Sequence, residues 1–103
     1  MIDTQKLRKT NFDRCLNDRF IVFTEAWGDL ELELVEITEH QREKLECFSL
    51  IFKGPKEKLF HQKLYTLTHP DLGEFILFLV PITYGKQDAI YYQAVFNRIL
   101  EDD

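Results

Sequence analysis

Residues 73–81 read GEFILFLVP, and six apolar residues follow one another without a break before the closing proline. Successive side chains of a strand point to opposite faces, so a strand with one wet face alternates apolar and polar residues. An unbroken run therefore predicts a strand with two apolar faces. Phe75, Leu77 and Leu79 form one face, and Ile76, Phe78 and Val80 form the other. An N-terminal helix or a partner chain must cover the second face, which is the best candidate interface if the helix lies elsewhere.

Five further segments have the composition of strands, with alternating, β-branched or aromatic residues. They are residues 19–27, 30–38, 47–55, 63–69 and 89–97. In the second of them, leucine alternates with glutamate until Val35, where the phase slips and indicates a β-bulge or the end of the strand. The stretch HPDLG at residues 69–73 combines the residues of a tight turn, so it predicts a hairpin whose second arm is the opening stretch.

One short helix is expected near the N-terminus. Phe12, Cys15 and Leu16 have the i, i+3, i+4 spacing of an amphipathic stripe within residues 4–18, and the helix should begin nearer residue 9 than residue 4. Helical patterns do not alternate with strands, which argues against a parallel sheet. We therefore expect a mainly β (α+β) fold, in which about six antiparallel strands form a barrel-like or strongly bent sheet with one N-terminal helix, as a single domain over residues 1–103.

Composition limits the partners and the compartment. The net charge of −5 opposes nucleic-acid binding, and no apolar run approaches the roughly 20 residues of a membrane span. The N-terminal stretch lacks the apolar centre of a secretory signal, so a cytoplasmic location is the expectation. Cys15 and Cys47 are too few and too far apart for a disulfide framework or a metal knuckle, and we expect reduced thiols in or near the core.

Catalytic and metal-binding motifs are weak in this sequence. His61 and His69 would lie about 26 Å apart on one continuous strand, which is too far for one ion. Ser49 is the only serine, and it lies mid-strand without a nucleophile elbow. We therefore expect no catalytic residue, no metal and no cofactor. The alternative is a small-ligand or catalytic site near the mouth of the barrel, formed by His61, Tyr65, His69 and Asp71.

The distribution of charged residues and the aromatic residues in predicted loops are the two features of the sequence that bear on binding to a partner. Acidic residues predominate from residue 29 to 46 and lysines from residue 53 to 63. This split either steers a partner or is neutralised where the two regions lie side by side, and the second interpretation is the simpler. Trp27 and Tyr84 lie in predicted loops, where such side chains either anchor a contact or cover the end of the core.

Four stretches in order carry a family resemblance. They are LELELVEI at residues 30–37, FSLIFKGP at 48–55, LYTLTHPDLGEFILFLVPI at 64–82 and YYQAVFN at 91–97. Over residues 12–97 the chain resembles a family of small bacterial proteins known as a domain of unknown function, with the pattern FSLxFxGP, HPxLGxFxLFLVP and AVFN. Lys63 departs from it, because the family often has glycine before the tyrosine strand. The resemblance implies a compact β-rich domain without an established activity, and the association of some members with genes for phage-tail-like collar or fibre proteins implies an assembly role.

Two functional hypotheses follow. The first is an uncharacterised non-enzymatic interaction or assembly module, associated with phage-tail-like structures, that binds a protein partner and neither nucleic acid nor membrane. It leaves homo-oligomerisation open. The second is the small-ligand-binding or catalytic β-barrel with the site named above. A concave pocket that contains the two histidines would favour the second hypothesis, and an exposed apolar face would favour the first.

Overall fold

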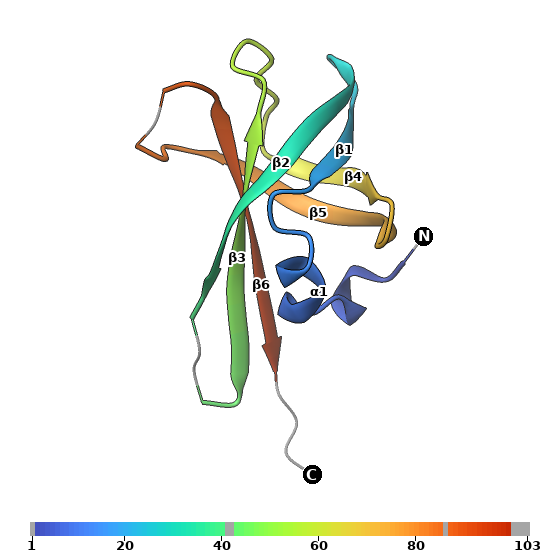
Figure 1. Ribbon diagram of the computed structural model, residues 1–103, viewed down its shortest axis with the longest axis vertical. Helices are drawn as coiled ribbons and strands as arrows, with labels where there is room; N and C mark the ends of the chain where they lie inside the picture. Colours follow the sequence, from blue (N-terminus) through green and yellow to red (C-terminus); the bar gives the residue numbers. More distant parts are fainter. Residues whose placement is uncertain (1, 41–42, 86, 100–103) are drawn as a thin grey trace.

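The computed structural model describes residues 2–40, 43–85 and 87–99. Within that part of the chain lie a 3-10 turn, one α-helix and six strands, and the strands close into an antiparallel barrel in the order β1-β2-β3-β6-β5-β4 (Figure 1). Their bounds are η1 Thr4–Lys6, α1 Lys9–Asp13, β1 Arg19–Thr24, β2 Gly28–Glu39, β3 Leu45–Gly54, β4 Lys63–His69, β5 Gly73–Ile82 and β6 Ile90–Ile99. The expected fold class is confirmed.

The predicted bulge lies at Val35. Leu34 is opposite Phe52 and Glu36 is opposite Ile51, so Val35 is the extra residue between two register pairs of β2 and β3. A bulge bends its strand and increases the local twist. This lets the long strand β2 pair with β1 along its first half and with β3 along its second half, as Figure 1 shows.

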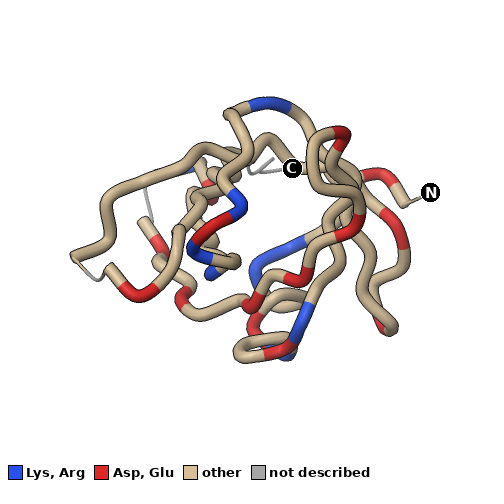
Figure 2. The backbone as a smooth tube through the Cα atoms, turned by 90° about the horizontal axis from the view of Figure 1, so that it is seen from above, with Lys and Arg blue, Asp and Glu red and all other residues tan. Residues whose placement is uncertain are grey.

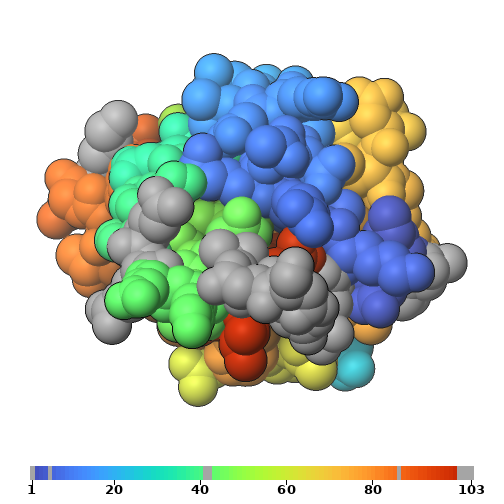
Figure 3. Space-filling model, turned by 90° about the horizontal axis from the view of Figure 1, so that it is seen from below, coloured from blue at the N-terminus to red at the C-terminus, as the bar shows by residue number. Residues whose placement is uncertain are grey.

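Aromatic side chains close both ends of the core. At one end, the fully buried ring of Phe12 on α1 packs against Phe48, Phe75 and Phe96, at centroid distances of 6.1, 6.1 and 5.4 Å. Figure 3 shows the N-terminal segment lying across this end of the barrel. At the other end, the ring of Phe60 stacks on Tyr92 at 4.0 Å. The helix therefore covers an end of the barrel and not the outer face of a strand.

The prediction that Leu16 shares the buried stripe with Phe12 and Cys15 is wrong. Leu16 is 44% exposed, whereas the other two are buried. The helix ends at Asp13, and the following residues turn toward β1 through Asn17 with φ of 73°. Helical spacing therefore does not extend to Leu16, because the i, i+4 relation holds only while the helix continues.

Strands β5 and β6 pair with each other over only part of their length. Strand β5 pairs with β4 from Gly73 to Leu79, and β6 pairs with β3 along its whole length. The two pair with each other only at Val80, Pro81 and Ile82 of β5. Beyond this point they diverge, β5 toward the β4–β5 turn and β6 toward the C-terminal end (Figure 1). The contact between β5 and β6 thus rests on three residue pairs, and that between β1 and β4 on two. The sheet is open beside the β5–β6 pairs.

The opening stretch of the sequence is β5, and its two faces have different surroundings. Phe75, Leu77 and Leu79 are buried in the core, as expected. On the outer face, Ile76 is 37% and Phe78 is 49% exposed. Because α1 packs at the end of the barrel, it does not cover this outer face.

Candidate functional site

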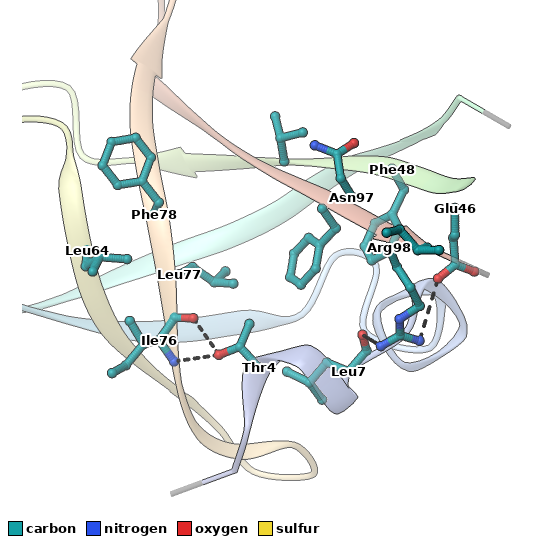
Figure 4. A pocket seen from close by; sticks show the side chains of 13 residues that line it. Thr4, Leu7, Glu46, Phe48, Leu64, Ile76, Leu77, Phe78, Asn97 and Arg98 are labelled. Carbon is teal, nitrogen blue, oxygen red and sulfur yellow. Dashed lines mark hydrogen bonds and ion pairs between the residues drawn. The ribbon is translucent and has the colours of Figure 1, made fainter. Parts of the chain in front are cut away.

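A groove of about 600 Å³ opens where β5 and β6 diverge. Its inner part is lined by the buried or half-buried side chains of Leu77 and Phe96, which belong to the core. Its rim is lined by the exposed side chains of Phe78 of β5, labelled in Figure 4, and Val95 of β6. A volume in this range and a predominantly apolar set of lining residues are both typical of ligand pockets.

Exposed apolar side chains concentrate at this groove. Ten large hydrophobic side chains are exposed in the described part of the chain, and five of them line the groove. These five are Leu64, Ile76, Phe78, Val95 and Ile99. Single exposed apolar residues are normal on a protein surface, whereas a contiguous group on one face marks an interaction site.

The N-terminal segment already occupies part of the open edge of β5. The Thr4 hydroxyl donates to the Ile76 carbonyl at 2.6 Å, and the Ile76 N–H donates to Thr4 Oγ1 at 3.2 Å (Figure 4). The Ile2 N–H donates to the Glu74 carbonyl at 2.8 Å. The Thr4 hydroxyl and the Ile2 backbone N–H thus take the place of β6 along the edge of β5 as far as Ile76.

Farther along, both strand edges face the groove without a strand partner. Backbone groups of alternate residues point to the same side of a strand. Phe78, two residues after Ile76, therefore presents its N–H and C=O to the groove. On β6, Gln93 pairs with Val80, so Val95 and Asn97 present theirs to the same opening. Among the described residues, no strand partner pairs with these edges.

One end of the groove is charged. The Arg98 guanidinium donates to the Leu7 carbonyl at 3.4 Å, and its Nη1 lies 3.9 Å from Glu46 Oε1 (Figure 4). That carboxylate oxygen is buried and accepts no hydrogen bond from the described part of the chain. A buried acceptor without a donor is destabilising, so this oxygen can take a donor from a bound molecule.

A second cluster joins Cys15, Asp18 and His69, whose ligand atoms lie within 4.8 Å of one another. His69 Nε2 is 2.9 Å from Asp18 Oδ2, and the Asp71 N–H donates to His69 Nδ1 at 3.0 Å. Cys15 Sγ lies 4.0 Å from the same Nδ1. Sequence reasoning missed this cluster because His69 is more than 50 positions from Cys15 and Asp18 and shares no motif with them.

The arrangement of this cluster favours structural hydrogen bonding. Because Nδ1 accepts from Asp71, the proton of a neutral His69 is on Nε2 and is donated to Asp18. The two ring nitrogens point in different directions, so an ion beside Asp18 at Nε2 is directed away from Cys15 at Nδ1. Burial raises the pKa of the Cys15 thiol, and the charges of Asp18 and Asp71 raise it further. A protonated thiol is both a poor nucleophile and a poor metal ligand.

The alternative ligand site is divided into two pairs. The buried Tyr65 donates its hydroxyl hydrogen to the carbonyl of the exposed His61 at 2.6 Å. His69 is buried and contacts the backbone of Asp71. Tyr65 and His69 are four residues apart on β4, which is about 13 Å along a strand. The structure therefore brings these residues together in pairs and not as one site.

The two predicted loop aromatics lie away from the groove, at the end of the barrel opposite α1. Trp27 is exposed, and its Nε1–H donates to the Leu59 carbonyl at 2.9 Å. Tyr84 donates to the Glu36 carboxylate, and its ring stacks on Tyr91 at 4.5 Å. The hydrogen bond from Tyr84 lowers the pKa of Glu36. Both side chains have local partners that hold them in place.

The acidic and basic regions meet in space. Lys53 is the register partner of Glu33 and pairs with Asp88 at 3.1 Å. Lys63 lies 3.7 Å from Glu25. Figure 2 shows acidic and basic positions beside one another on the strands and loops around this end of the barrel. Glu33 and Lys53 belong to the two regions, whereas Asp88 and Glu25 lie outside residues 29–46, so the lysines are neutralised by acids from inside and outside the acidic region.

Fold and groove together define the chain as a small antiparallel β-barrel protein with an open apolar groove between β5 and β6. The chain matches the model of the family described as domain of unknown function DUF6916 over residues 7–96, and it belongs to that family. The resemblance to an uncharacterised family is thereby confirmed. Comparison with curated proteins found no match, and neither did comparison with solved structures. No helix in the described ranges has the length and hydropathy needed to cross a membrane.

Proposed function

We propose that this protein is a non-enzymatic interaction or assembly module that binds a partner protein in the groove between β5 and β6. The observation that carries the proposal is the second apolar face of β5, which no helix covers and which continues into the groove. Fully burying one large apolar side chain contributes about 1.5–3 kcal/mol. Phe78, Val95 and Leu64 together therefore supply several kcal/mol of binding free energy if a partner covers them.

The chemistry of the two clusters that contain histidines supports this choice. The raised pKa of Cys15 disfavours a thiolate nucleophile, and His69 is engaged on both ring nitrogens. Tyr65 is bonded to the backbone carbonyl of His61, so the side chains of these two residues do not form an acid–base pair with each other. The sequence resemblance suggests a role in phage-tail-like assembly. Identification of the partner protein tests that suggestion.

The test is co-purification from the native host, with the bound chains identified by mass spectrometry. The groove variant is the double substitution Phe78→Ser and Val95→Ser. The matched control is Phe23→Ser with Leu59→Ser, two exposed apolar residues (39% and 51%) that lie outside the groove. We expect one partner to be recovered with the native protein and the control and to be lost with the groove variant.

A partner that the groove variant retains as well as the native protein would overturn the proposal. Hydrogen exchange of the complex provides the second measurement. Protection of residues 76–80 and 93–97 is expected on binding, whereas protection confined to the loops around Trp27 and Tyr84 would place the interface elsewhere.

A further inference from the structure

We infer that the occupant of the groove is an extended segment of the partner that pairs as an added strand with the open edge of β6 and places a cationic side chain at Glu46. This inference rests on the proposed function and goes further by naming the chemical class of the partner. It follows from three independent features of the groove, namely its strand edges, the apolar side chains on both of its faces and its one buried acceptor.

The strand edges determine the backbone conformation of the occupant. Val95, Asn97 and Ile99 are alternate residues of β6, and their N–H and C=O groups face the groove beyond the last pair with β5. The five residues 95–99 offer about 16 Å of unpaired edge at the usual strand rise. Only an extended backbone has donors and acceptors at the matching spacing. On the opposite edge, the Thr4 hydroxyl satisfies both backbone groups of Ile76, so the β5 edge takes polar partners where β6 is absent.

The apolar lining determines the side chains of the occupant. Residues of an added strand that point inward meet Leu77 and Phe96 at the core, and those that point outward lie between Phe78 and Val95. Both faces of the occupant are therefore apolar over about four to six residues. This is the same pattern that β5 itself shows, and it differs from the alternating pattern of a strand with one wet face.

Glu46 determines the charge of the occupant and distinguishes a partner from a second copy. Arg98 Nη1 lies 3.9 Å from its buried Oε1, which is beyond hydrogen-bond distance, and this oxygen accepts no hydrogen bond in the described residues. A lysine or arginine at one end of the segment supplies the donor. The net charge of −5 also favours approach of a basic segment. In a second copy, the continuous apolar run of β5 is preceded by Glu74 and followed by Pro81, so neither end of the run carries a lysine or arginine for Glu46.

The experiment uses a phage-displayed library of random twelve-residue peptides, selected on the full chain and counter-selected on the Phe78→Ser, Val95→Ser variant. We expect selected peptides to share an unbroken run of apolar, mostly β-branched residues with a lysine or arginine at one end. Synthetic versions should bind the native protein at least ten-fold more tightly than the groove variant. They should bind the Phe23→Ser, Leu59→Ser control as tightly as the native protein.

Two further measurements separate strand pairing from simple apolar contact. N-methylation of alternate peptide nitrogens should weaken binding ten-fold or more, and methylation of the intervening nitrogens should have little effect, because only one edge of the peptide pairs with β6. Glu46→Gln should weaken binding of the lysine peptide about ten-fold and leave a norleucine version nearly unchanged.

Each contrary result decides a different point. If no peptide is enriched while the natural partner still needs the groove, the extended segment is wrong and the proposed function stands. Binding that is indifferent to N-methylation also rejects strand pairing. A dimer that forms with rising concentration and is lost in the groove variant would make a second copy the occupant. If the natural partner does not need the groove, the proposed function falls together with this inference.

Discussion

At the scale of single residues, His69 connects three parts of the chain. It ends β4, accepts the Asp71 N–H within the hairpin turn and bonds Asp18 between α1 and β1. The side chain is buried, so its removal leaves a cavity between the segments that it joins. The hydrogen bonds of one imidazole thus hold the N-terminal segment against the β4–β5 turn.

We predict that His69→Ala lowers the free energy of unfolding by about 2–3 kcal/mol, because it leaves a cavity and an unpaired turn N–H. Urea denaturation followed by tryptophan fluorescence measures the loss. Asp18→Ala is the matched control and should cost about 1 kcal/mol or less, because the Asp18 side chain is nearly half exposed and water replaces its bond. Equal losses in the two variants would contradict the central position of His69.

Cys15 gives a prediction on pH. Its thiol pKa is raised by burial and by the charges of Asp18 and Asp71. In the Cys47→Ser variant, iodoacetamide should therefore react with native Cys15 much more slowly than with the urea-unfolded chain at pH 8. Because the unfolded thiol releases its proton at lower pH than the folded one, stability is complete below the unfolded pKa and falls as pH rises above about 8.5. Rapid alkylation of the native protein at neutral pH would contradict this.

At the scale of elements, α1 is too short to be stable alone, and its five residues depend on Phe12. Phe12→Ala should lower the free energy of unfolding by about 3–5 kcal/mol, because it removes the ring that packs against three other rings. Leu16→Ala is the control and should change it by less than about 0.5 kcal/mol, since Leu16 is largely exposed. Thermal denaturation by circular dichroism measures both, and a similar cost for the two would show that Leu16 packs in solution.

Strand β3 ends at a glycine for a steric reason. A Cβ at Gly54 would lie 2.9 Å from Leu32 Cδ2 and 3.2 Å from Tyr92 Cε1. Gly54→Ala should therefore cost about 1–3 kcal/mol through overpacking, and adding Leu32→Val should recover part of the loss. Gly28→Ala, at φ of 71° with open space around the added Cβ, should cost about 1 kcal/mol that Leu32→Val does not recover. Denaturant midpoints of the single and double variants test the difference.

At the scale of the whole molecule, the groove between β5 and β6 leaves apolar side chains in contact with water. These exposed side chains contribute little to the stability of the fold. Replacing Leu64, Phe78 and Val95 by serine or threonine should reduce binding of an apolar fluorescent dye to the native protein several-fold. The free energy of unfolding should change by less than about 1 kcal/mol, because all three side chains are exposed. Dye fluorescence and urea denaturation measure the two effects. A large loss of stability would show that these residues serve the core and not a partner.

Much of the fold was predictable from local pattern. Strand β4 begins and ends where its alternation does, at Lys63 and His69, and the HPDLG turn forms the expected hairpin. The phase slip at Val35 is a bulge because each residue of a strand must face one side or the other. Leu16 was mispredicted because helical spacing says which residues share a stripe only where the helix continues, and it does not say where the helix ends.

The candidate site was predictable only in part. Ile76, Phe78 and Val80 were identified as an outer apolar face from the sequence, and the exposure of Ile76 and Phe78 is visible in the structure. The β6 half of the groove was not anticipated, nor was the contact of Thr4 with Ile76, which spans 72 positions. The cluster at His69 was equally hidden, because Asp18 is 51 positions away.

The sequence by itself determined that residues 73–81 form a strand with two apolar faces, because side-chain alternation and turn chemistry act over a few residues. Only the tertiary structure decided which face meets water. That outcome depends on where the Phe12 ring packs and on how early β6 leaves β5, and both are set by contacts between distant segments. A local pattern can show that an apolar face needs a cover, but only the packing shows that residues 2–40, 43–85 and 87–99 supply none on this side.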